Sequence, residues 1–186
     1  MLTNRFIHGA KLCDMPVELL SLMNDKLTEL ENNNSPDWHI GGYRQWNIHG
    51  PTIVRPILEE IDLEYNRLVI PGLEPVIDFF NKYVSGVFRF RLSILDQGNH
   101  IPYHPGHQCP RIHIPLSPTK STFNMRYRDG IRSIQMEYGN AYLVNVCVDH
   151  EVRMDDDGPR RNAFFSFQQF KTNELNRRFD ISFNNK

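Results

Sequence analysis

The sequence has no long apolar run, no cysteine pairing pattern and no excess of charge of one sign. No stretch of about 18 apolar residues occurs, and Met1 to Cys13 lack the continuous apolar segment of a signal peptide, so we expect a cytoplasmic protein without a membrane partner. Its three cysteines are widely spaced and indicate neither a disulfide framework nor a thiolate zinc site. A formal net charge of −1 provides no broad basic surface, so nucleic acid is not an expected partner.

The composition is that of a folded globular chain. Hydrophobic residues make up 40% of the 186 residues and charged residues 23%, values that exclude a disordered chain and allow one self-contained core. We therefore treat residues 1–186 as a single domain whose pattern changes near residue 85. Nothing in the sequence indicates an oligomeric state.

Residues 1–85 are expected to be mainly helical support and lid. Apolar residues recur every three or four positions between residues 16 and 30, which predicts a helix with Asp14 as its N-cap. Further helices are expected over residues 52–62 and 74–83. The segment 41–49, with two glycines and interleaved aromatic and polar residues, is interpreted as a lid or substrate loop, or as a loop packed on the rest of the domain.

Residues 86–170 change to a period of two, which predicts β-strands. Residues 88–95 alternate between apolar and largely polar positions. Further strands are expected at 111–116, 122–128, 131–138, 141–148 and 161–169, and Asp129-Gly130 predicts a hairpin with a type I′ turn. Short strands without intervening helices predict a mainly β fold, a jelly-roll, cupin-like barrel braced by the N-terminal helices.

Two histidines near opposite ends of the β segment are candidate metal ligands. His104 lies between two prolines, and His150 follows a predicted strand. Arg161 begins another strand eleven residues later. Two imidazoles and a guanidinium suit a catalytic metal with an anionic cosubstrate beside it, because a guanidinium pairs bidentately with a carboxylate. His100, His107 and His113 compete as ligands on spacing alone.

The strand at residues 111–116 carries two further candidates. Arg111 and His113 share one face, while Ile112 and Ile114 share the other. If the apolar face packs on the helices, Arg111 and His113 face the barrel mouth together with Ser93. The alternative is that both side chains face solvent on an edge strand.

These elements resemble the core motif of a known family. Residues 93–104, the segment Arg111-Ile-His113-Ile-Pro-Leu116, His150 and Arg161 together look like the aspartyl/asparaginyl β-hydroxylase motif, over about residues 86–170. The resemblance implies a double-stranded β-helix that holds non-haem Fe(II) and uses 2-oxoglutarate and dioxygen.

The same resemblance implies roles for individual residues. His104 and His150 match the iron ligands. Arg161 matches the arginine that anchors the distal carboxylate of 2-oxoglutarate, with Ser93 as a hydroxyl partner. A one-residue gap in the match would transfer the anchoring role to Arg160.

The remaining matched residues concern the pocket and the substrate. His113 matches a residue that lines the cosubstrate pocket, and Arg111 one that reaches the cosubstrate or a substrate carboxylate. Arg91 offers further positive charge for the substrate.

One position departs from the usual facial triad. A carboxylate is expected two residues after the first histidine, but Gly106 stands there. The resemblance implies an enzyme that hydroxylates an unactivated carbon of a small carboxylate-bearing substrate, such as an amino acid, a peptide or a related metabolite, and releases succinate and CO2. Two alternatives remain: a halogenase that uses the vacant position at Gly106, and a non-catalytic, cupin-like binding module.

Overall fold

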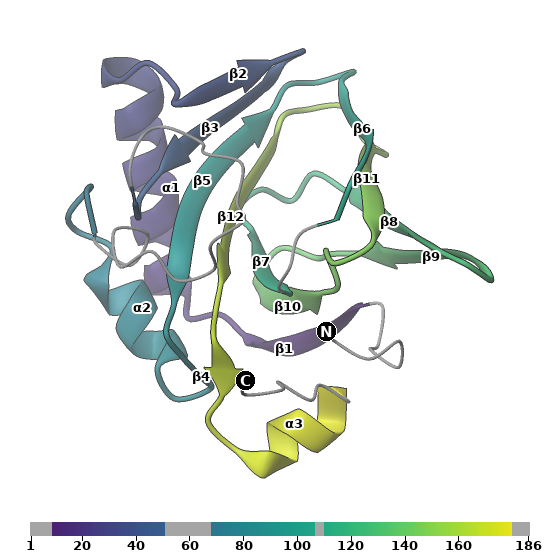
Figure 1. Ribbon diagram of the computed structural model, residues 1–186. Helices are drawn as coiled ribbons and strands as arrows, with labels where there is room; N and C mark the ends of the chain where they lie inside the picture. Colours follow the sequence, from purple (N-terminus) through teal and green to yellow (C-terminus); the bar gives the residue numbers. More distant parts are fainter. Residues whose placement is uncertain (1–8, 51–67, 107–109, 180–186) are drawn as a thin grey trace.

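The chain folds into two facing antiparallel β-sheets with helices α1 (Val17–Asn33) and α2 (Glu74–Phe80) on one side (Figure 1). The computed structural model describes residues 9–50, 68–106 and 110–179. The predicted helix at 52–62, together with His107 and Cys109, lies outside these residues. None of the helices in the described ranges is long and apolar enough to cross a membrane.

Within the described residues, the larger sheet has seven strands and the smaller has four. The order in the larger sheet is β1 (Gly9–Asp14), β10 (Asn140–Val144), β7 (Arg111–Pro115), β12 (Arg160–Ser166), β5 (Phe88–Leu95), β3 (Tyr43–Asn47) and β2 (Trp38–Ile40). The order in the smaller sheet is β6 (His100–His104), β11 (Asp149–Met154), β8 (Ser121–Tyr127) and β9 (Gly130–Gln135). A short pair, β13 (Gln169–Phe170) and β4 (Val84–Ser85), leads to helix α3 (Asn173–Phe179).

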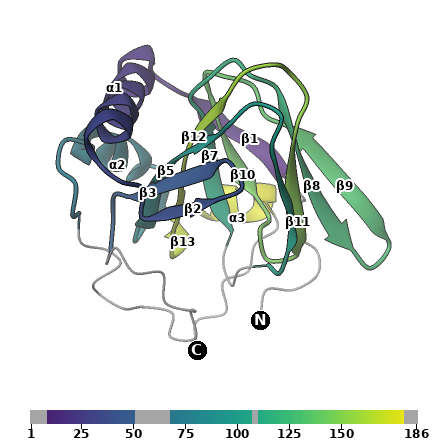
Figure 2. The same cartoon turned by 90° about the horizontal axis from the view of Figure 1, so that it is seen from above.

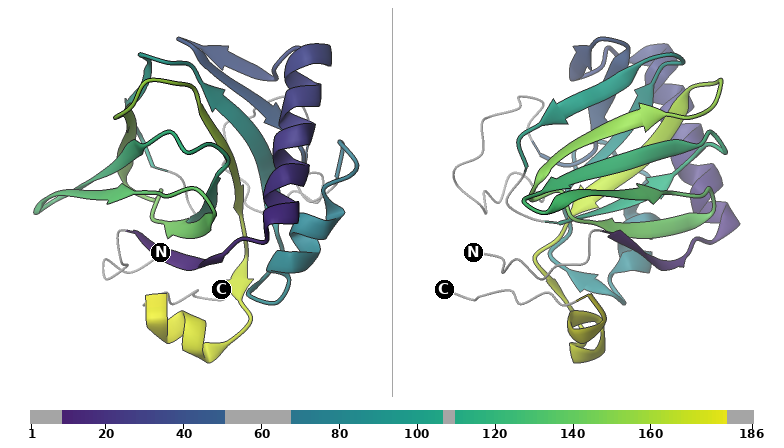
Figure 3. Two further views of the ribbon diagram at one scale, coloured as in Figure 1. Left: turned by 180° about the vertical axis from the view of Figure 1, so that it is seen from behind. Right: turned by 90° about the vertical axis from the view of Figure 1, so that its right-hand side faces the viewer.

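The smaller sheet lies opposite the larger one, as the views from above and from behind show (Figures 2 and 3). Their facing sides share an apolar cluster in which Leu95 and Val144 of the larger sheet meet Phe123 and Val152 of the smaller. The predicted mainly β jelly-roll fold is therefore confirmed.

The outer face of the larger sheet is covered by α1 (Val17–Asn33) and α2 (Glu74–Phe80) (Figure 1). Leu20, Met23 and Leu27 of α1 are buried in one cluster with Leu92 and Ile114 of the sheet. Side chains three and four residues apart share one helix face, so the apolar stripe of α1 matches the apolar face of the strands.

Two local predictions near turns are wrong. The first residue before α1 is Pro16, and no side chain caps the helix, whereas Asp14 ends β1 and accepts a hydrogen bond from Lys11. The β8–β9 hairpin forms with Arg128 and Asp129 as its loop. Of the non-glycine residues described, Arg89 alone has positive φ, so Asp129 does not adopt the conformation that a type I′ turn requires.

Each strand predicted after residue 85 has a counterpart, with ends shifted by up to about four residues, but β6 and β11, which contain His104 and His150, were not predicted. The expectation of a mainly helical first half is incomplete, because β1, β2, β3 and β4 also lie there. In particular, residues 43–47 of the predicted lid form a strand that pairs with β5. The partners of β1 and β3 are about 50 to 130 residues away in the chain, and such distant pairing leaves a weak local pattern.

Candidate metal and cosubstrate site

The structure brings His104 and His150 together inside the barrel. β6 and β11 are antiparallel neighbours, and the two histidines are register partners on them. Their ring centroids lie 4.1 Å apart, with the ring planes inclined by 63°. His150 is buried, and His104 is half-buried at the end of its strand. Two residues that are 46 positions apart in the chain can therefore act on one ion.

The hydrogen bonds of the two rings fix which nitrogen can bind a metal. Nδ1 of His104 lies 3.0 Å from the carbonyl oxygen of Pro102, and Nδ1 of His150 lies 2.8 Å from that of Val148. A carbonyl oxygen only accepts, so each Nδ1 carries the proton and each Nε2 carries the lone pair. Orientation of a ligand histidine by such a backbone contact is a common feature of metal sites.

Burial keeps His150 neutral. Burial first, and the nearby His104 second, lower the pKa of His150 to about 3. The ring is therefore neutral at neutral pH, with one proton on Nδ1, which is the state that a metal ligand requires.

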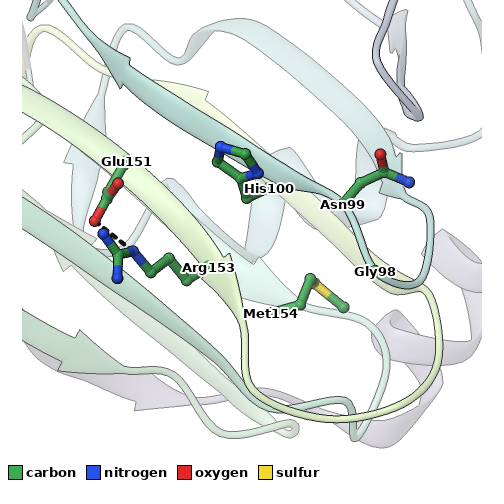
Figure 4. Close-up of a pocket in the computed structure, with 6 residues that line it drawn as sticks. All are labelled: Gly98, Asn99, His100, Glu151, Arg153 and Met154. Carbon is green, nitrogen blue, oxygen red and sulfur yellow. Dashed lines mark ion pairs between the residues drawn. The ribbon is translucent and has the colours of Figure 1, made fainter.

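Of the competing histidines, His100 lies away from this pair. It begins β6 and is exposed. With Glu151 and Arg153 it lines a shallow pocket of about 360 Å³ on the outer side of the smaller sheet, where these two residues form an ion pair of 2.8 Å (Figure 4). Side chains alternate along β11, so Glu151 and Arg153 point away from the interior, to which His150 belongs.

Arg161 is not brought to the histidines, which corrects the expectation from the sequence. Its Nη2 donates a hydrogen bond of 2.9 Å to Thr28 Oγ1 and lies 3.9 Å from Glu31 Oε2, both on α1. Its register partner on β5 is Ile94, a member of the cluster beneath the helices. The guanidinium therefore lies on the helical side of the larger sheet.

Arg160 takes the interior position instead. It is only 4% exposed, and its register partner is Leu95, which belongs to the cluster between the sheets. Burial lowers the pKa of Arg160 to about 10, so the side chain is still charged at neutral pH. Its Nη2 is buried and has no hydrogen-bond partner in the part of the chain that the structure describes.

His113 lies on the same inner face as Arg160 and is also incompletely hydrogen-bonded. Its ring stacks on Phe164 with centroids 5.3 Å apart, and its Nδ1 lies 3.3 Å from Nδ2 of Asn162. Burial, together with Arg160 and Arg111, holds the pKa of His113 well below its ordinary value. With Asn162 Nδ2 as the donor, the neutral ring carries its proton on Nε2, which is buried without a partner among the described residues.

The remaining predicted residues also reach the interior. Arg111 is buried, with its guanidinium 5.2 Å from the ring centroid of Phe164, and its charge influences His113 and His150. Ser93 is 1% exposed, and its hydroxyl donates to the carbonyl oxygen of Asn162 at 3.3 Å. Arg91 pairs with Phe164 in register and so shares this face.

Positive charge therefore dominates the interior. Neither the hydrogen bonds nor the ion pairs of the described residues place a carboxylate against Arg160, and its pKa responds to burial and Tyr43 alone. A buried arginine without a carboxylate partner is costly to the folded state. The arrangement suits an anion.

Sequence reasoning missed Tyr43, Gln45 and Asn162. The first two alternate with Arg44 and Trp46 along β3 and face Leu95 and Ser93. Side chains of residues 43–47 alternate with a period of two, but the positions that face the interior are polar. A strand is usually recognised by apolar residues at its inward positions, and β3 lacks that signal. Asn162 lies two residues after Arg160 on β12, so its inward position can be predicted once Arg160 is known to point inward.

Gly106 is held against the backbone that leads to His150. A Cβ built on Gly106 would overlap the carbonyl group of Cys147 and lie 2.7 Å from the backbone nitrogen of Val148. A third protein ligand at residue 106 is therefore sterically excluded. The described residues contain no cluster of three or more histidine, cysteine, aspartate or glutamate side chains suited to a metal ion.

We expect Gly106→Ala to lower the free energy of unfolding by about 1–3 kcal/mol, the usual cost of overpacking. The added methyl must displace the backbone at Cys147 and Val148, and the carbonyl of Val148 orients His150. Metal affinity should fall with stability. Thermal unfolding and Fe(II) titration measure the two effects. Gly98→Ala is the control for metal affinity: its φ of +75° strains the backbone on substitution, but nothing lies within 4 Å of a Cβ there, so Fe(II) binding should not change. Equal stability of Gly106→Ala and wild type would contradict the steric argument.

Known proteins share the fold of this chain. No curated protein matches the sequence significantly. Among solved structures, an oxidoreductase of the 2OG-Fe(II) oxygenase family from Burkholderia pseudomallei is similar, with a TM-score of 0.59 and 11% identity over 90% of this chain and 82% of that one. A Pseudomonas putida prolyl-4-hydroxylase gives a TM-score of 0.59 and 9% identity over 86% of this chain and 91% of that one. At these identities the likeness shows the fold alone.

The sequence itself matches a family model. The model described as aspartyl/asparaginyl beta-hydroxylase matches residues 62–169, more than half of the chain, a range that contains both histidines and Arg160. The chain belongs to the aspartyl/asparaginyl β-hydroxylase family.

Proposed function

We propose that this protein is an Fe(II)- and 2-oxoglutarate-dependent dioxygenase that hydroxylates an unactivated carbon of a small carboxylate-bearing substrate. The observation that carries the proposal is a pair of oriented histidines beside a buried, cationic interior that lacks carboxylates among the described residues. The fold shared with a 2OG-Fe(II) oxygenase and a prolyl-4-hydroxylase supports it.

The histidine pair fits iron. Nε2 of His104 and Nε2 of His150 would hold the ion, and the backbone at Gly106 leaves the third place of the facial triad without a protein ligand. When bound, the iron and 2-oxoglutarate supply the oxidising chemistry, in which the cosubstrate is converted to succinate and CO2 and one oxygen atom of dioxygen enters the substrate.

The buried donors fit 2-oxoglutarate. Arg160 Nη2 and His113 Nε2 are polar atoms without partners in the described structure, and an anion between them would satisfy both. We assign the distal carboxylate to Arg160 and Ser93. His113 lies toward the metal-binding rings, since His113 and His150 both pack on Phe123, with ring centroids 5.4 Å and 5.2 Å from it.

The protein would contribute binding and orientation. Arg160 and Ser93 hold the cosubstrate at one end, and the neutral His113 donates a hydrogen bond without adding charge. Apolar residues such as Phe123 and Val152 line the opposite side of the interior and exclude water from the reacting atoms.

The substrate is proposed to carry a carboxylate. Arg91 and Arg111 lie on the same inner face of the larger sheet as Arg160, through their register partners Phe164 and Ser166. An amino acid, a peptide side chain or a related metabolite would match this charge.

Release of succinate tests the proposal. The protein is loaded with Fe(II) and 2-oxoglutarate under nitrogen and then exposed to air, and succinate is measured by mass spectrometry. We expect binding of 2-oxoglutarate that depends on the metal and succinate above the level without protein. Absence of both binding and succinate would instead indicate a non-catalytic, cupin-like module.

Halogenation is the second candidate, because the backbone at Gly106 keeps a coordination position without a protein carboxylate. A chloride there would direct halogen to the substrate. With a substrate in hand, product masses with and without chloride distinguish the two reactions.

A further inference from the structure

Tyr43 and Arg160 flank the same residue of β5. Tyr43 of β3 and Arg160 of β12 are both register partners of Leu95, so their side chains share the inner face of the larger sheet. Arg160 also influences the pKa of Tyr43, and Tyr43 that of Arg160. The distal carboxylate is assigned to Arg160, so Tyr43 lies toward that end of the cosubstrate.

A row of three polar side chains on β3, here called the β3 ladder, holds Tyr43. The hydroxyl of Tyr43 donates to Gln45 Oε1 at 3.0 Å, and Gln45 Nε2 lies 3.2 Å from Asn47 Oδ1. Gln45 and Asn47 are 4% and 3% exposed. Residues two apart on a strand share a face, so the ladder runs along the inner face of the larger sheet. Ser93, the register partner of Gln45, lies on the same face and is among the groups that lower the pKa of Tyr43.

Burial of the Gln45 and Asn47 amides costs free energy, because they lose their hydration and gain only the hydrogen bonds that they make within the protein. A buried polar row of this kind calls for a functional explanation. Its chemistry allows the bonds to run in either direction. An amide carries both a donor and an acceptor, so a flip of Gln45 and Asn47 turns Gln45 from acceptor to donor toward Tyr43. The phenol O–H is then available to an anion beside Arg160. Burial raises the pKa of Tyr43, so the hydroxyl keeps its proton.

We propose that Tyr43 donates a hydrogen bond to the distal carboxylate of 2-oxoglutarate beside Arg160, and that Gln45 and Asn47 position its ring. This assignment rests on the proposed function. It makes Tyr43 a cosubstrate-binding residue and Gln45 a positioning residue, both supplied by the segment before residue 50. The strand β3 would then select a keto acid with a second carboxylate.

Two keto acids of equal length distinguish this role from a merely structural one. 2-Oxopentanoate has the five-carbon chain and keto acid end of 2-oxoglutarate but lacks the distal carboxylate. Wild type and Tyr43→Phe, loaded with Mn(II) to prevent turnover, are titrated with each compound by calorimetry. We expect Tyr43→Phe to weaken 2-oxoglutarate binding about tenfold to a hundredfold, since a hydrogen bond to a charged group is lost. Binding of 2-oxopentanoate should not change.

Control variants separate the possible outcomes. Tyr127→Phe removes another partly buried hydroxyl, one that accepts from Asn145, and should leave both affinities unchanged. Gln45→Met should weaken 2-oxoglutarate alone, and it keeps the test valid if Tyr43→Phe fails to fold.

Equal loss for both keto acids, or no loss for either, would overturn the role of Tyr43 while leaving the proposed function intact. Wild-type protein that binds neither compound would contradict the proposed function itself, and the role of Tyr43 with it.

Discussion

Replacing either His104 or His150 by alanine is expected to lower succinate formation by more than about a hundredfold. Loss of a residue that only orients a ligand already costs about 10- to 100-fold in metal affinity or activity, so loss of one of two protein ligands must cost more. Fe(II) binding, followed by anaerobic titration, should fall in parallel. The reason is geometric, since the two rings lie 4.1 Å apart and neither can be replaced by a neighbour among the described residues.

His100→Ala provides the matched control. It removes an imidazole from the same strand, but His100 is exposed and lies in the outer pocket beside Glu151 and Arg153. Iron binding and succinate formation should equal those of wild type. Wild-type activity in both His104→Ala and His150→Ala would show that these two histidines do not bind the metal.

The second large effect is expected from Arg160→Met, with Arg161→Met as its neighbour in the chain and its control. Loss of a buried partner from a charged hydrogen-bonded pair costs about 2–5 kcal/mol, so the dissociation constant of 2-oxoglutarate should rise at least about thirtyfold. Arg161 donates to Thr28 on the helical side of the sheet, and its loss should leave that constant unchanged. Calorimetry in the presence of Mn(II) measures both. The opposite ranking would restore the anchoring role to Arg161.

Arg160→Met should stabilise the folded protein although it weakens the binding of 2-oxoglutarate. The pKa of Arg160 is lowered to about 10 in the folded chain, so its charge is less favourable there than in the unfolded chain at every pH below that value. Without 2-oxoglutarate, Arg160→Met should therefore raise the free energy of unfolding by roughly 1–3 kcal/mol. A fall in thermal stability would mean that Arg160 serves the fold and not an anion. Such a trade between stability and binding is common where a site holds an unpaired charge.

The sequence predicted most of the β core because its signal is local. Residues 88–95 alternate clearly, and β5 occupies the same range. The strands β1 and β3 were missed because β1 is short and partly polar and β3 has polar residues on its inner face. A segment whose inner positions read Tyr, Gln and Asn gives no hydrophobic pattern, and only its pairing with β5 defines it as a strand.

The sequence pattern alone could not determine whether Arg160 or Arg161 faces the interior. Successive side chains on a strand point to opposite faces, so an error of one position moves a residue from the interior to the helical side. The sequence narrowed the anchor to two adjacent arginines. Register with β5 decided between them, since Arg160 pairs with Leu95 and Arg161 with Ile94.

By itself, the sequence determined a mainly β fold, the two histidines and the glycine in place of a carboxylate, because these depend on residue type and local period. The tertiary structure alone decided that His104 and His150 are neighbours, that Arg160 is the inward arginine, and that Tyr43 shares its face of the sheet. Those facts depend on which strands pair and in what register, and strand pairing is set by packing between segments far apart in the chain.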